Sequence, residues 1–163
     1  MSLSDLLRGL TKDDLAILGE IAVSMSSLEH MVQAVIWWLL NLSVEKGLIV
    51  TGPLALNQKT EMLAALAKGL SAEASKTLKN IITDIDIVRP ERNRKLHAVW
   101  RHNENMEKIA LTLGKDRRSI KETKVVTKDL EDARDAIKRV EFSLIHWFIG
   151  YAQAHPSSQG KSE

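Results

Sequence analysis

The chain has 163 residues, which is enough to bury one hydrophobic core without disulfides or a structural metal. It contains no cysteine, and this excludes a disulfide-stapled scaffold, a Cys-ligated zinc or iron–sulfur site and a thiol nucleophile. Hydrophobic residues make up 44% and charged residues 27%, the composition of a soluble globular protein. We expect a single domain over residues 1–154, followed by a flexible polar tail over 155–163.

The N-terminus lacks the basic and then apolar layout of a signal peptide. The most apolar run, Ala34 to Leu40, is far shorter than the roughly 20 residues needed to cross a bilayer. Both features predict a cytoplasmic protein that has no membrane partner.

The formal net charge of +2 hides an uneven distribution. Residues 89–124 hold eleven basic and five acidic residues, a net charge of +6, while the rest of the chain has a net charge of −4. A basic segment on an acidic body is typical of proteins that bind an anionic partner such as nucleic acid, although a solvated charged surface gives the same pattern.

Helical periodicity dominates the first hundred residues. Thr11 followed by acids predicts a helix start, and apolar residues recur at steps of three and four until about Leu42. Residues 44–56 contain two glycines and a proline and predict a loop, after which Asn57 caps a second helix. A third helix begins after Ser71, Pro90 kinks it or starts a fresh turn, and 91–100 is again compatible with helix.

The period changes after Trp100. Partial alternation over 106–113, turn residues at Gly114 and β-branched residues over 120–126 predict a short hairpin, and Thr127 caps a final helix. The sequence therefore predicts an all-α fold, an antiparallel bundle of about four main helices with a small β-hairpin, at about 106–126, inserted before the last helix.

Motifs for metal or cofactor chemistry are absent from the sequence. The five histidines have no ligand spacing, and there is no glycine-rich phosphate loop, Gly-x-Ser-x-Gly motif or paired-carboxylate motif. We predict no metal and no cofactor.

One segment carries catalytic residue types, with Arg92, Asn93 and His97 in the form Arg-Asn-x3-His. Asn93 and His97 share a helix face, so the asparagine can hydrogen-bond the imidazole. Arg92 lies about 140° around the helix and reaches the same point only through its long side chain, a bent backbone or a second subunit. An imidazole beside a permanent cation supplies the parts needed to cleave RNA without a metal, with the ribose 2′-hydroxyl as nucleophile.

The motif resembles that of the HEPN superfamily, whose hallmark is Arg-x4–6-His with a polar residue often following the arginine. Arg92, Asn93 and His97 match it, and Ala98 stands where the family often has glycine. The resemblance implies a homodimer in which two motifs share a cleft. It further implies a metal-independent endoribonuclease, such as a toxin with an antitoxin partner or a phage-defence effector. His97 would be the general acid or base, Arg92 would stabilise phosphate charge and Asn93 would orient one of them.

Further residues near the motif are candidates for binding RNA. We expect phosphate contacts from the basic residues and base stacking from the tryptophan, namely Arg89, Arg94, Lys95, Trp100 and Arg101. Four basic residues of the hairpin form either an arm along RNA or a protected strand edge, namely Arg117, Arg118, Lys121 and Lys124.

Two other functions fit the same residues. The first is a non-catalytic HEPN-like module that binds RNA, a nucleotide or a protein through this groove. The second is a helical structural or regulatory dimer in which the motif only organises the interface.

Overall fold

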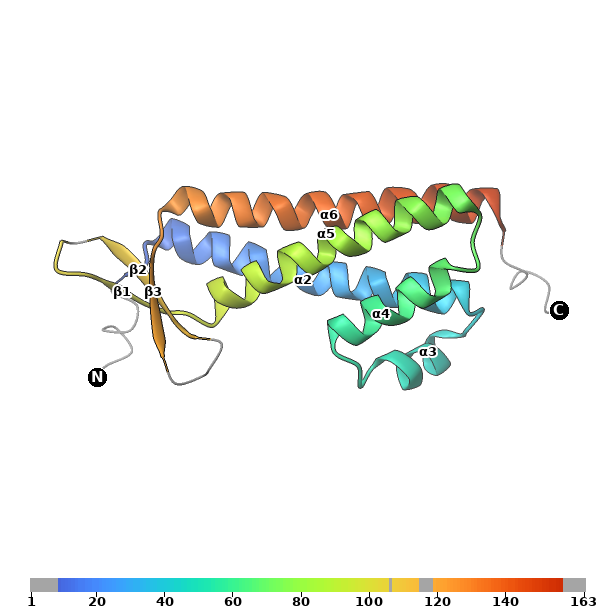
Figure 1. The fold of residues 1–163 in the computed structure, drawn as a ribbon, viewed down its shortest axis with the longest axis horizontal. Helices are drawn as coiled ribbons and strands as arrows, with labels where there is room; N and C mark the ends of the chain where they lie inside the picture. Colours follow the sequence, from blue (N-terminus) through green and yellow to red (C-terminus); the bar gives the residue numbers. More distant parts are fainter. Residues whose placement is uncertain (1–8, 106, 115–118, 157–163) are drawn as a thin grey trace. The chain divides into compact units, whose positions relative to one another are not determined.

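The structure is a computed structural model that describes residues 9–105, 107–114 and 119–156. Within these ranges the chain forms five helices and three strands (Figure 1). They are α2 (Lys12–Leu39), α3 (Val44–Thr51), α4 (Leu56–Ala67), α5 (Ala72–Leu96), β1 (Val99–His102), β2 (Lys108–Leu113), β3 (Ile120–Lys124) and α6 (Thr127–Ala154). The predicted fold class, a helical bundle with a small antiparallel sheet before the last helix, is confirmed.

The chain divides into two compact units. The first comprises the chain up to residue 25 together with residues 88–137, and the second comprises residues 26–87 together with the chain from residue 138. The three long helices, α2, α5 and α6, each contribute residues to both units.

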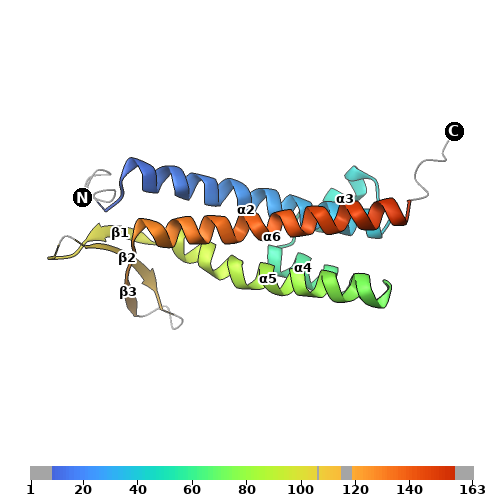
Figure 2. The ribbon, with the colours of Figure 1, turned by 90° about the horizontal axis from the view of Figure 1, so that it is seen from above.

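The first unit contains the sheet, whose strand order is β1-β2-β3 with antiparallel pairing throughout (Figure 2). The predicted hairpin corresponds to β2 and β3, and β1 adds a third strand where the sequence was compatible with helix. Trp100 of β1 is 6% exposed and lies opposite the buried Ala110 of β2, and this burial favours a strand over further helix. Strand β3 is exposed along its whole length.

Asp14, a fully buried acid, joins three elements of the first unit. Its Oδ2 accepts hydrogen bonds from the backbone N–H and the hydroxyl of Thr11, at 2.9 Å each, and from Lys108 Nζ of β2 at 2.5 Å. Its Oδ1 accepts from the hydroxyl of Thr127, at the start of α6, at 2.9 Å. Thr11 Oγ1 in turn accepts from the Asp14 N–H, so the predicted helix cap at Thr11 is confirmed.

The cap of α6 differs from the prediction by one residue. Asp129 accepts the Val126 N–H at 2.7 Å, so Val126 holds the cap position, while the Thr127 hydroxyl bonds Asp14. The cap of α4 differs by two residues, because Gln58 accepts the Ala55 N–H in place of a cap at Asn57. The predicted start of α5 after Ser71 is confirmed, and the Ala74 N–H donates to Ser71 Oγ, which caps the helix.

The second unit contains the short helix α3, where the sequence predicted a loop. Gly47 permits this helix to pack closely, because a Cβ at that position would lie 2.5 Å from Trp37 Cγ. Trp37 Nε1 donates to Thr51 Oγ1 at 2.9 Å, and the Thr51 hydroxyl donates to the Gly47 carbonyl at 2.9 Å. The loop prediction was wrong for residues 44–51, because Gly47 serves a tertiary contact rather than a turn, and it is confirmed for residues 52–55, which join α3 to α4.

Helix α2 is long and apolar enough to cross a membrane, judged by length and composition alone. The sequence argument considered only its longest uninterrupted apolar run and did not anticipate this. One face of α2 is buried in the two units, through Ile17, Ile21, Met25, Leu28, Val32, Val35 and Ile36.

We predict that Asp14→Asn lowers the free energy of unfolding at pH 7 by about 2 to 3 kcal/mol, since it leaves Lys108 without its buried partner. Burial alone would raise the pKa of Asp14, but the hydrogen bonds from Lys108, Thr11 and Thr127 lower this pKa to about 2, below its ordinary value of 3.8. The stabilisation is therefore complete above about pH 4 and is lost as the pH falls through 2.

Urea denaturation between pH 7 and pH 2 measures this effect. The control is Asp13→Asn, which removes an exposed acid from the same helical turn. Equal losses from the two variants at pH 7 would contradict the role of Asp14.

We also predict opposite effects of alanine at two helical glycines. Gly47→Ala lowers the free energy of unfolding by about 1 to 2 kcal/mol, because the clash with the Trp37 ring outweighs the gain in helix propensity. Gly19→Ala raises it by about 0.5 to 1 kcal/mol, because a Cβ at Gly19 meets no atom within 4 Å. Thermal denaturation of both variants checks the signs, and a stabilised Gly47→Ala would show that α3 does not pack on Trp37.

Candidate functional site

The predicted motif lies at the C-terminal end of α5, in the first unit. The His97 N–H donates to the Asn93 carbonyl at 3.0 Å and completes the last helical turn. The chain then leaves the helix and extends into β1, which pairs with β2. At this junction of helix and sheet the His97 side chain is exposed.

Arg92 and Asn93 contact each other directly. Arg92 Nη1 donates to Asn93 Oδ1 at 2.8 Å, whereas the expected bond between Asn93 and the His97 imidazole is not found in the part of the chain that the structure describes. The Arg92 Nε is buried and has no hydrogen-bond partner there. A buried guanidinium N–H without a partner is costly, and an added acceptor would remove that cost.

A groove of about 540 Å³ runs between the end of α5 and the sheet. The helix contributes Pro90, Asn93, Arg94 and His97, and the opposite wall is formed by Thr112, Leu113, Gly114 and Lys121. Arg92 does not line this groove, so within one copy the groove holds the imidazole but not the guanidinium of the motif.

A smaller hollow of about 100 Å³ shares Arg94, Thr112 and Lys121 with the groove and adds Lys95. Burial lowers the pKa of Lys95, and Asp129 opposes this while Arg94 adds to it. Glu91 lies in the same hollow and pairs with Arg94. Together the two hollows carry three cations and one acid, and this balance suits a phosphate group.

The other predicted binding residues lie elsewhere in the first unit. Arg89 lines neither hollow. Arg101 pairs with Glu122 across the sheet at 2.6 Å. Trp100 is buried, so in this conformation its ring is not offered to a base.

Sequence reasoning left Lys121 either in a basic arm along RNA or on a protected strand edge. It lies on the edge strand β3, where the register pairs it with Thr112 and brings it to the wall opposite His97. Lys124 pairs with Glu107, and Arg117 and Arg118 lie outside the described residues. The sequence signal that places Lys121 on the wall opposite His97 is the hairpin register, which is counted outward from the turn at Gly114.

No group of three or more His, Cys, Asp or Glu residues that could hold a metal is found within the described ranges. Comparison of the chain with family models, with curated proteins and with solved structures found no match. The resemblance to the HEPN superfamily therefore stays a prediction from the sequence motif.

We predict that Lys121→Ala weakens binding of a 12-nucleotide single-stranded RNA about threefold to tenfold at low salt, since it removes one cation from the groove. The slope of log affinity against log salt should fall by about 0.7, the value for one lost phosphate contact. Fluorescence anisotropy with 2′-O-methyl RNA measures both quantities without cleavage. Lys76→Ala, an exposed lysine of the second unit, is the control and should leave the slope unchanged.

Proposed function

We propose that the chain is a HEPN-like, metal-independent endoribonuclease. The observation that carries this proposal is the exposed imidazole of His97 on a groove that also presents Arg94 and Lys121. An imidazole can accept and donate a proton, and the two cations suit the flanking phosphates of a single strand.

The reaction that fits these groups uses the RNA's own nucleophile. The ribose 2′-oxygen attacks phosphorus, the bond from phosphorus to the 5′-oxygen breaks, and the products are a 2′,3′-cyclic phosphate and a 5′-hydroxyl. Either His97 takes the proton of the 2′-hydroxyl while water protonates the leaving 5′-oxygen, or water takes the first proton while His97 supplies the second. The cations of the groove bind the flanking phosphates and hold the strand for this attack.

Arg92 is assigned to the charge that develops on the non-bridging oxygens. Its guanidinium bonds Asn93 and lies outside the groove of its own copy, so we place it toward the groove of a second copy in a homodimer. As an RNA-cleaving dimer the protein would serve as a toxin, with an antitoxin protein as a further partner, or as a phage-defence effector.

A module that binds RNA without cleaving it is the second candidate. It is favoured by one observation, that the groove of a single copy gathers cations around His97 but not Arg92. In that case Lys121 and Arg94 matter for affinity, and no product forms.

We predict that the purified protein cleaves RNA in EDTA and that His97→Ala lowers the rate at least 100-fold, the usual contribution of a general acid or base. His102→Ala, an exposed histidine of β1, is the matched control and should keep the wild-type rate. Gel analysis of end-labelled RNA gives the rates, and mass spectrometry identifies the cyclic phosphate.

Mixing subunits tests the shared site. Arg92→Ala and His97→Ala proteins, each inactive alone, should regain up to about a quarter of the activity when mixed. Equal cleavage by wild-type and His97→Ala proteins would overturn the proposal, and salt-dependent binding without any product would select the binding module.

A further inference from the structure

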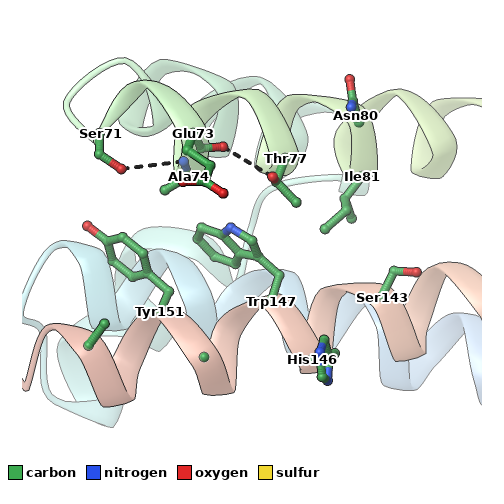
Figure 3. A pocket seen from close by; sticks show the side chains of 12 residues that line it. Ser71, Glu73, Ala74, Thr77, Asn80, Ile81, Ser143, His146, Trp147 and Tyr151 are labelled. Carbon is green, nitrogen blue, oxygen red and sulfur yellow. Dashed lines mark hydrogen bonds between the residues drawn. The ribbon is translucent and has the colours of Figure 1, made fainter.

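A groove of about 720 Å³ lies between the start of α5 and the end of α6, within the second unit (Figure 3). Four of its lining residues have small side chains, namely Ala74, Ser143, Gly150 and Ala154. At these positions no large side chain fills the space between the two helices. Clefts of about this volume hold small organic molecules in proteins. The groove shares no lining residue with the two hollows beside His97.

Two aromatic rings of α6 form one wall of this groove. Figure 3 shows Trp147 and Tyr151 extending from α6 toward α5. The two rings are stacked, with their centroids 5.2 Å apart and an angle of 10° between their planes. Trp38 meets Tyr151 edge-on at 5.7 Å, and His155 stacks on Tyr151 at 4.3 Å. The neighbouring rings therefore hold this wall in place, and the indole of Trp147 stays partly exposed on the groove.

The charges along the groove favour a cationic ligand. Glu73 is the only aspartate, glutamate, lysine or arginine among the twelve described residues that line the groove. The other polar lining groups are hydroxyls, an amide and one imidazole, while Lys76 and Lys79 of α5 lie outside the lining. A carboxylate and an aromatic face both attract a cation, and the carboxylate repels phosphates and other carboxylates.

We propose that this groove binds an arylalkylamine, a small molecule that joins a flat aromatic ring to a protonated amine. The ring packs against the indole of Trp147 on α6, and the ammonium group donates to the carboxylate of Glu73 on α5, across the groove. An anionic ligand would be repelled by Glu73, and an aliphatic amine would leave the aromatic wall uncovered. The site uses none of the residues beside His97, so it does not depend on the proposed RNA cleavage.

Isothermal titration calorimetry of the full chain with three probes tests the class of ligand. Tryptamine carries both the ring and the ammonium group, indole-3-propionate carries the same ring with a carboxylate, and butylamine carries the ammonium group alone. We expect tryptamine to bind with a dissociation constant of about 0.1 mM, and each of the other two probes to bind about tenfold more weakly or worse. Equal affinity for tryptamine and either other probe, or failure of tryptamine to saturate the protein at about 5 mM, would overturn the proposal.

Two variants, each with a matched control, locate the bound tryptamine. Glu73→Gln should weaken tryptamine about tenfold, because it removes the charge and keeps the shape, whereas Glu61→Gln, at an exposed acid of α4, should change nothing. Gly150→Leu should weaken it about tenfold by placing a side chain in the groove, whereas Gly19→Leu in the first unit should not. A Cβ at either glycine meets no atom within 4 Å, so both leucine variants fold. Unchanged affinity in Glu73→Gln or in Gly150→Leu would overturn the inference.

Discussion

A buried carboxylate that must be fully paired is the constraint on which the first unit depends. An ionised acid is costly to bury unless hydrogen bonds replace its water, and Asp14 obtains four of them from the start of α2, from β2 and from the start of α6. Because Lys108 is the first residue of β2, this cluster fixes the strand that later forms a wall of the groove. The position of Thr112 and Gly114 opposite His97 thus follows from an interaction that itself lies outside the groove.

The groove differs from the Asp14 cluster in the kind of interaction it contains. The cluster is buried and satisfied, whereas His97 and Lys121 are exposed, and Arg92 keeps one buried N–H without a partner in the described part of the chain. Polar side chains that are exposed to solvent, next to elements held in place by the buried Asp14 cluster, are available to bind a ligand. The net charge of +6 over residues 89–124 accordingly has a structural location, since three of its cations, Arg94, Lys95 and Lys121, line the two hollows at this end of α5.

Much of the fold followed from sequence patterns, and the exceptions have physical causes. Apolar stripes and caps predicted α2, α5 and α6, and alternation around the turn at Gly114 together with β-branched residues predicted β2 and β3. The segment at Gly47 is helical because this glycine accommodates Trp37 rather than forming a turn, and the segment at Trp100 is a strand because burial in the sheet overrides local helix compatibility. For the site, the spacing of Arg92 and His97 predicted that the two side chains share one location. The hydrogen bond from Arg92 to Asn93 depends on side-chain rotamers, and the place of Lys121 on the groove wall depends on strand register.

The central claim is that RNA binds in the groove at His97. Proton NMR of the five histidine imidazoles during titration with a 2′-deoxy oligonucleotide, which cannot be cleaved by the proposed reaction, tests it most directly. The account predicts that the His97 resonances shift with saturation while those of His146 and His155 in the second unit remain unchanged. Saturable binding that leaves His97 unmoved would contradict it.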